Sequence, residues 1–190
     1  MCRQCGRRTH SPSILCPSCH KNPSPLSHIA AAVAFGGPAR EAIHQFKFEG
    51  MFGVAPVLAE LMIAAWPAWA SDVDLLCPIP LHHERERERG YNQSNLLVRS
   101  LQRQVGIESD FNALHRVKHT RPQIGLDKTE RQDNVKRAFK AVRERVAGRR
   151  ILLVDDVCTS GATLTAAAIA LLESGATMVS GYCLARPLIE

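Results

Sequence analysis

Residues 151–164 read Ile-Leu-Leu-Val-Asp-Asp-Val-Cys-Thr-Ser-Gly-Ala-Thr-Leu, a fully apolar strand that runs into two acids and a loop of small hydroxyl side chains. The loop opens a helix, so its free backbone N–H groups and the positive end of the helix dipole can attract a phosphate. The residues expected to hold that phosphate are Thr159, Ser160, Gly161, Ala162 and Thr163. A plain strand-to-helix turn with capping side chains is the structural alternative.

Two adjacent acids, Asp155 and Asp156, stand at the carboxyl end of this strand. Carboxylates in that position can accept hydrogen bonds from the vicinal hydroxyls of a ribose or act on a Mg²⁺ ion carried by the ligand. No Gly-Lys-Ser or Gly-Lys-Thr follows the glycine, so the loop is not a Walker P-loop. Loop and acids together predict a site for a ribose 5-phosphate, with Asp155 and Asp156 as its catalytic pair.

A second group of reactive side chains, Cys2, Cys5, Cys16 and Cys19, forms two Cys-x-x-Cys pairs in a segment with almost no aliphatic residues. This spacing lets four sulfurs converge on one Zn²⁺ ion, and a four-sulfur site has no open position for catalysis. We therefore expect a structural zinc-binding module over residues 1–27, because the segment cannot bury a core of its own. A redox dithiol is the alternative. The basic residues of the module can contact nucleic acid or simply keep it soluble.

The chain of 190 residues is 45% hydrophobic and 22% charged, which fits one full-sized core with a small appendage. Its formal net charge of +6 favours anionic partners, either a polyphosphate small molecule or nucleic acid. No apolar run is long enough to span a bilayer, and the sequence opens with no signal-peptide pattern. We expect a cytoplasmic protein that does not insert into membranes.

Strands and helices alternate from residue 28 onward, which predicts an α/β domain over residues 28–190 with a mostly parallel sheet flanked by helices. The expected strands are 28–35, 72–77, 151–154 and 177–184, and the expected helices are 39–48, 54–69, 92–106 and 162–174. Residues 82–90 alternate in charge and are expected to form a charged loop. Residues 114–137 are polar and weakly periodic, so we expect a mobile loop with short helical pieces.

The acidic strand end and its loop resemble the phosphoribosyl-diphosphate (PRPP) signature of type I phosphoribosyltransferases. The whole chain resembles the ComF competence family through the cysteine pairs and an ordered series of segments. These are Phe46 to Gly50, Pro78 to Leu81, Arg89 to Gln93, Arg116 to Gln123, and the single residues Arg131, Asn134 and Phe139. The resemblance implies a type I phosphoribosyltransferase fold, PRPP and Mg²⁺ as ligands, and a link to DNA uptake.

The resemblance also implies roles for several basic residues. Arg89 and Gly90 resemble a pyrophosphate loop, where a cation and free backbone N–H groups suit a diphosphate. Lys47 is assigned to the same group, although its sequence setting alone fits a surface lysine equally well. Arg85 and Arg87 are secondary candidates for pyrophosphate. A flexible hood over the ligand, a solvated basic loop or a nucleic-acid contact would each explain Arg116, Lys118, His119 and Arg121.

Two functions remain open at this stage. One is a phosphoribosyltransferase that releases pyrophosphate; its acceptor is unassigned, since Thr159 stands where hypoxanthine-type enzymes place a carboxylate. The other is a non-catalytic accessory protein of DNA uptake that senses PRPP or a nucleotide and contacts single-stranded DNA, a helicase or another protein of the competence machinery. Three further cysteines, Cys77, Cys158 and Cys183, are expected to be small buried residues, with Cys158 inside the phosphate loop.

Overall fold

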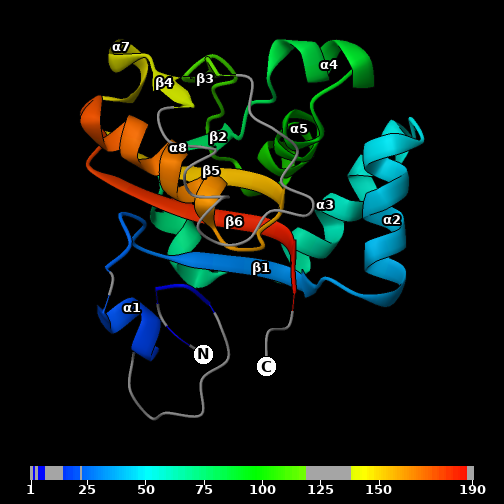
Figure 1. Cartoon of the computed structure of the whole chain (residues 1–190), viewed down its shortest axis with the longest axis horizontal. Coiled ribbons are helices and arrows are strands. Elements are labelled where there is room, and N and C mark those ends of the chain that lie inside the picture. The colour runs from blue at the N-terminus through cyan, green and yellow to red at the C-terminus, as the bar shows by residue number, and fades with distance from the viewer. Residues whose placement is uncertain (1, 3, 7–14, 22, 119–137, 188–190) are drawn as a thin grey trace.

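A four-stranded sheet, parallel throughout, forms the centre of the computed structural model, which describes residues 2, 4–6, 15–21, 23–118 and 138–187. The strand order is β1-β6-β5-β2 (Figure 1). Their bounds are Ile29–Ala34 for β1, Leu75–Pro78 for β2, Arg150–Val157 for β5 and Met178–Arg186 for β6. The four strands lie where the sequence pattern predicts them, and the parallel arrangement is confirmed.

Strand β5 shows why the sheet is covered on both faces. Alternate side chains of a strand point to opposite faces. Ile151 and Leu153 belong to the apolar core that packs against α8 (Ala162–Glu173), whereas Leu152 and Val154 belong to a second core on the other side. All four side chains are fully buried. Burial on both faces explains why the sequence of this strand is a continuous apolar run, as expected for a strand between two helical layers.

The second core is formed by α2 (Gly37–Phe48), α3 (Ala55–Ala64) and α5 (Gln93–Val105). Figure 1 shows α8 in front of the sheet and α3 and α5 behind it. Gly181 of β6 allows α8 to pack closely, because a Cβ atom there would lie 2.9 Å from Cδ1 of Leu164. The start of α8, and the loop before it, is thereby held directly on the sheet.

One prediction about the elements is wrong: residues 83–89 form a short helix, α4 (His83–Arg89), and not a charged loop. Glu84 and Glu86 fall in its first turn and Arg87 and Arg89 in its last turn, positions that the helix dipole favours for these charges. Gly90 ends the helix with a left-handed φ of 83°, which a glycine adopts without strain. The alternating charges therefore complement a helix as well as they would an exposed loop.

Part of the predicted loop over 114–137 is also wrong. β3 (Leu114–Arg116) pairs antiparallel with β4 (Phe139–Ala141), and the remainder, 119–137, lies outside the described residues. The short helical elements are α1 (Pro17–Lys21), η1 (Phe52–Val54), η2 (Ala68–Asp72) and α7 (Arg143–Val146). None of the helices in the described ranges is long and apolar enough to cross a membrane.

The cysteine segment lies against the sheet beside β1. Gly6 approaches the backbone so closely that a Cβ atom there would lie 2.4 Å from the carbonyl oxygen of Ile29. Arg186, the last residue of β6, donates a hydrogen bond to the carbonyl oxygen of Cys5. The side chain of Leu26 is fully buried in the core shared with β5, so the chain joins the domain core just before the expected boundary at residue 27.

Candidate functional site

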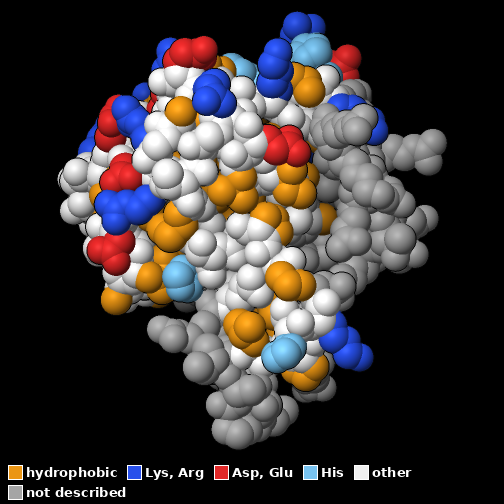
Figure 2. Space-filling model, turned by 90° about the vertical axis from the view of Figure 1, so that its left-hand side faces the viewer, with side chains coloured by type: hydrophobic (Ala, Val, Ile, Leu, Met, Phe, Trp, Pro, Cys, Tyr) orange, Lys and Arg blue, Asp and Glu red, His pale blue; other side chains and the backbone are white. Residues whose placement is uncertain are grey.

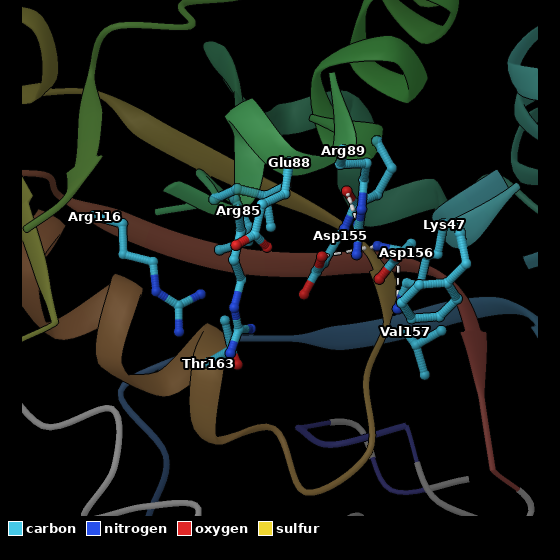
Figure 3. A pocket seen from close by; sticks show the side chains of 13 residues that line it. Lys47, Arg85, Glu88, Arg89, Arg116, Asp155, Asp156, Val157 and Thr163 are labelled. Carbon is cyan, nitrogen blue, oxygen red and sulfur yellow. Dashed lines mark hydrogen bonds and ion pairs between the residues drawn. The ribbon is translucent and has the colours of Figure 1, made fainter. Parts of the chain in front are cut away.

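A cavity of about 440 Å³ opens at the carboxyl ends of β2 and β5. Its lining comes from α2, the β2–α4 connection, α4, α5, β3, β5 and α8, elements that are far apart in the sequence (Figure 3). The lining residues are Lys47, Phe48, Ile79, Leu81, Arg85, Glu88, Arg89, Gln93, Arg116, Asp155, Asp156, Val157 and Thr163. In α/β sheets, ligands bind outside the carboxyl ends of the strands, which is where this cavity lies.

The acid pair lies in this cavity, and Asp155 is held from two sides. Its Oδ1 atom accepts one hydrogen bond of 3.1 Å from the hydroxyl of Ser94 and one of 2.9 Å from the backbone N–H of Asp156. Ser94 is itself fixed at the start of α5, where its N–H donates to the capping side chain of Asn92 at 2.9 Å. Both carboxyl groups are buried, so their positions are set before a ligand binds.

Asp156, the second acid of the pair, forms an ion pair with Lys47. The ammonium group of Lys47, in the last turn of α2, lies 2.9 Å from Oδ2 of Asp156. The side chain of Lys47 is 22% exposed and that of Asp156 only 4%, so this ion pair is largely shielded from solvent in the wall of the cavity. An anionic ligand that attracts Lys47 would have to compete with Asp156 for it.

Arg89 lies beside this ion pair. Its Nη1 donates to Oε1 of Gln93, and its guanidinium lies 5.3 Å from the ring centroid of Phe48. Burial lowers the pKa of Arg89, although the nearby charge of Asp156 opposes the effect. An arginine remains charged in spite of such a shift. Gly90, which was assigned to the same loop, ends α4 and is not part of the cavity lining.

Two further arginines lie at the opposite end of the cavity. Figure 3 shows Arg85 and Arg116 on the side of Thr163, with Asp155 between them and the group formed by Lys47 and Arg89. Burial, followed by the charge of Arg85, lowers the pKa of Arg116, and Asp155 opposes this. Arg116 belongs to β3, and its predicted hood partners His119 and Arg121 lie outside the described residues.

The phosphate loop joins β5 to α8 and bounds a second, smaller cavity of about 20 Å³ beside Asp155. Gly161 precedes the helix with a left-handed φ of 82°, which explains the need for glycine there. The hydroxyl of Ser160 accepts a hydrogen bond of 3.3 Å from the N–H of Ala162. Thr159, Gly161, Ala162 and Thr163 line the small cavity, so four of the five predicted phosphate contacts face one space.

The buried acid pair gives a testable pH dependence. Burial and the charge of Asp156 raise the pKa of Asp155 to about 7. An unfolded aspartate titrates near pH 4, so the folded chain binds more protons between about pH 4 and 7 and the contribution of Asp155 to stability falls as the pH rises. At pH 8 the Asp155→Asn variant should therefore have a free energy of unfolding on the order of 2–4 kcal/mol above that of the parent.

Urea unfolding at pH 8 and at pH 5 would measure this gain, which should shrink at the lower pH. Asp74→Asn is the matched control, because hydrogen bonds from Arg150 lower the pKa of exposed Asp74 to about 2 and its removal should give no gain. An Asp155→Asn variant that is less stable than the parent at pH 8 would contradict this prediction, because the neighbours of Asp155 would then fully offset the cost of burying its charge.

The four N-terminal cysteines form the second candidate site. All four side chains are buried, and their sulfur atoms all lie within 4.8 Å of one another. The Cys5 and Cys16 sulfurs are 3.7 Å apart, close to the edge of about 3.8 Å that a tetrahedron with zinc–sulfur bonds of about 2.3 Å would have. Burial and the neighbouring thiols raise the pKa of Cys19 well above its usual value, a cost that a bound cation would offset. The arrangement therefore fits a structural metal ion.

The structure brings together side chains that the sequence alone did not connect. Ser94 lies at the start of the helix predicted over 92–106 and is not among the predicted site residues, yet its hydroxyl contacts Asp155, which lies 61 positions later in the chain. Arg85 was a secondary candidate and lines the cavity, whereas Arg87 does not. Cys77, Cys158 and Cys183 are buried, as expected. Ser94 directly follows the Arg89 to Gln93 segment, which is the one signal that could have identified it.

Comparison with known proteins finds one matching family over the C-terminal part of the chain and relatives that match nearly the whole chain. The family described as phosphoribosyl transferase domain matches residues 112–189. The DNA utilization protein YhgH of Salmonella typhimurium is 33% identical over 99% of this chain and 85% of its own length. The competence protein F of Haemophilus influenzae is 32% identical over 97% of this chain and 84% of its own.

A solved structure titled as the allosteric regulatory enzyme of purine biosynthesis matches 70% of this chain and 25% of that one, with 24% identity and a TM-score of 0.46. The profile match and the parallel sheet give the chain a phosphoribosyltransferase-like fold. Since relatives of at least 30% identity extend over nearly the whole chain, the protein belongs to the ComF family, which includes competence protein F and DNA utilization protein YhgH.

Proposed function

We propose that the protein binds PRPP with Mg²⁺ and transfers the phosphoribosyl group to an acceptor in the cytoplasm, with release of pyrophosphate. One observation carries this proposal: two buried carboxylates lie between two groups of cations within a single cavity. PRPP has a matching order of charges, since its neutral ribose separates a phosphate from a diphosphate.

Each part of the ligand has a set of candidate residues. The 5-phosphate would bind at the start of α8, through residues 159–163, with Arg85 and Arg116 nearby. The ribose hydroxyls would donate to the carboxylates of Asp155 and Asp156. The diphosphate would lie at the end of the cavity where Lys47 and Arg89 are found, with Lys47 exchanging its contact with Asp156 for one with the ligand.

In the proposed reaction the bond between C1′ and the diphosphate oxygen breaks, and a bond forms between C1′ and the acceptor. Pyrophosphate leaves with the electron pair of the broken bond, and the acceptor loses a proton to solvent or to a base. Lys47 and Arg89 would stabilise the negative charge on the leaving group. Mg²⁺, held through Asp155, Asp156 and the ligand, would supply further positive charge there.

The test is calorimetry of PRPP binding to the intact protein, followed by an assay for pyrophosphate. We expect saturable binding with Mg²⁺, weaker binding when EDTA removes the metal, and pyrophosphate release when a suitable acceptor is added. A protein that is shown to be folded and does not bind PRPP in the presence of Mg²⁺ would contradict the proposal.

The alternative function is a non-catalytic accessory role in DNA uptake, in which PRPP or a nucleotide acts as a regulatory ligand. The printed names of the relatives, which refer to DNA utilization and competence, favour it. On the face shown in Figure 2, Lys and Arg side chains lie among Asp and Glu side chains and do not form one basic field. A sensor would release PRPP unchanged, and a DNA role would give binding that weakens steeply with salt.

We also propose the division of the chain into a zinc-binding module over 1–27 and a phosphoribosyltransferase-like domain over 28–190. The closely spaced cysteine sulfurs support the first part and the continuous sheet supports the second. In this division the module is structural, and single-stranded DNA or a competence protein is its candidate partner.

A further inference from the structure

A closed ring of hydrogen bonds leads from the strand that carries Asp155 back to the carboxyl group of Asp155. The backbone N–H of Ile79, just after β2, donates to the carbonyl oxygen of Val154 at 2.9 Å. The side-chain amide of Asn92 donates to the carbonyl oxygen of Ile79 at 3.0 Å and accepts from the N–H of Ser94 at 2.9 Å. The hydroxyl of Ser94 donates to Oδ1 of Asp155 at 3.1 Å, which closes the ring. The start of α5 is thereby fixed to both strands beside the cavity.

The hydroxyl of Ser94 is not needed for the start of α5 itself. The side chain of Asn92 caps the helix through the backbone N–H of Ser94, and every residue except proline has such an N–H group. Ser94 is nevertheless a buried polar residue, only 1% exposed. A buried hydroxyl is stable only when it is hydrogen-bonded, and the bond that it forms here is the one to Asp155.

The two oxygens of the Asp155 carboxyl group have different surroundings. Both hydrogen bonds that the described residues donate to it end on Oδ1, one from Ser94 and one from the N–H of Asp156. Each oxygen of a carboxylate can accept hydrogen bonds or bind a metal ion, so Oδ2 can serve a ligand while Oδ1 is held. Asp155 lines the cavity between the two groups of cations (Figure 3).

We propose that Ser94 is a positioning residue, which holds Oδ1 of Asp155 so that Oδ2 is presented to a ribose hydroxyl or to the metal ion of the ligand. The inference rests on the proposed function and adds to it a residue that acts on the ligand through Asp155. The terminal torsion of an aspartate side chain is broad, so a donor from the neighbouring residue alone leaves the carboxyl group free to turn. Ser94 restricts this rotation from a different element, α5.

Ser94→Ala should weaken the binding of PRPP with Mg²⁺ to the intact protein by about tenfold. Residues that orient a metal-binding carboxylate typically contribute about 10–100-fold to affinity or activity. Inorganic pyrophosphate in the presence of EDTA has neither a ribose nor a metal ion, so its Kd should be the same for parent and variant. Calorimetry would measure both ligands, and urea unfolding would show that the variant is folded.

A double-mutant cycle with Asp155→Ala tests whether Ser94 acts through Asp155. The carboxyl group that Ser94 orients is absent from Asp155→Ala. Adding Ser94→Ala to that variant should therefore change the Kd of PRPP by less than about twofold. A role of Ser94 in the packing of α5 alone would instead give the same loss of affinity in both backgrounds.

Ser109→Ala is the matched control. The hydroxyl of Ser109 also contacts α5, where it donates to the side chain of Gln102, but Ser109 is not part of the cavity lining. Its removal should leave the Kd of PRPP unchanged. The control thus distinguishes the loss of a serine hydroxyl bound to α5 from the loss of the bond to Asp155.

The possible results separate this inference from the function on which it rests. If PRPP does not bind the folded parent, the proposed function fails. If PRPP binds the parent and Ser94→Ala leaves its Kd unchanged, the positioning role alone is refuted. An equal loss of pyrophosphate binding in Ser94→Ala, an undiminished effect in the Asp155→Ala background or an equal effect of Ser109→Ala would also refute the positioning role alone.

Discussion

Replacing Asp155 and Asp156 together by asparagine should weaken PRPP binding in the presence of Mg²⁺ by about 100-fold or more. Each carboxylate would lose a charged hydrogen bond to a ribose hydroxyl or a contact with the metal, and such bonds contribute about 1.5–3 kcal/mol each. Two of them correspond to at least a factor of about 100 in Kd. Calorimetry with PRPP, with and without EDTA, would measure the loss, and the dependence on Mg²⁺ should disappear in the variant.

The same double variant should behave differently toward inorganic pyrophosphate. Lys47 loses its anionic partner when Asp156 becomes asparagine, and the cavity loses two negative charges near Arg89. Pyrophosphate without a ribose should therefore bind at least as tightly as it does to the parent. Glu88→Gln is the matched control, since Glu88 is an exposed acid of the same cavity lining. Unchanged PRPP binding in the double variant would contradict the prediction and show that Asp155 and Asp156 do not contact the ligand.

The second large effect concerns the cysteine cluster. Substituting Cys16 by serine should abolish stoichiometric zinc binding and unfold the N-terminal module, because structural zinc sites contribute about 10–16 kcal/mol to small domains that lack a core. We expect amide hydrogens of residues 15–21 to lose their protection while those of β5 keep theirs. Zinc content and hydrogen exchange would be measured on the same preparation.

Cys77→Ser provides the control for the cysteine cluster. Cys77 is as buried as the cluster cysteines but belongs to β2 and the core of the sheet, so this variant should retain one zinc per chain. Cooperative loss of β5 protection in Cys16→Ser would contradict an independent module. The contacts of Gly6 and Arg186 would then be the route by which the cluster stabilises the sheet.

The strand, loop and helix over 150–173 could be predicted from the sequence because their determinants are local. A four-residue apolar run, two acids, a loop with Gly161 and an apolar helix follow one another without interruption, and each part favours the same structure as its neighbour. The cysteine cluster could also be predicted from local sequence, since the spacing of the four cysteines already limits the ways in which their sulfurs can meet.

The partners of the acid pair could not be predicted, because they depend on contacts between distant segments. Periodicity places Ser94 near a helix start and Lys47 near a helix end, but nothing in the pattern shows that both lie beside one strand end. Residues 83–89 were predicted to be a loop for a different reason. Their alternating charges give no apolar face and put acids and bases in both end turns, so Gly90, which ends the helix, is the one local signal for it.

The position of β1 at the edge of the sheet has a consequence for biosynthesis. Among the described strands β1 pairs only with β6, and Ile29 lies opposite Gly181, which is translated about 150 residues later. At ribosomal rates of about 5–20 residues per second, the apolar strand waits roughly 8–30 s for its partner. All four cysteines of the cluster are translated by residue 19, so a metal ion that the cluster binds could be taken up while β1 is still unpaired and open to aggregation.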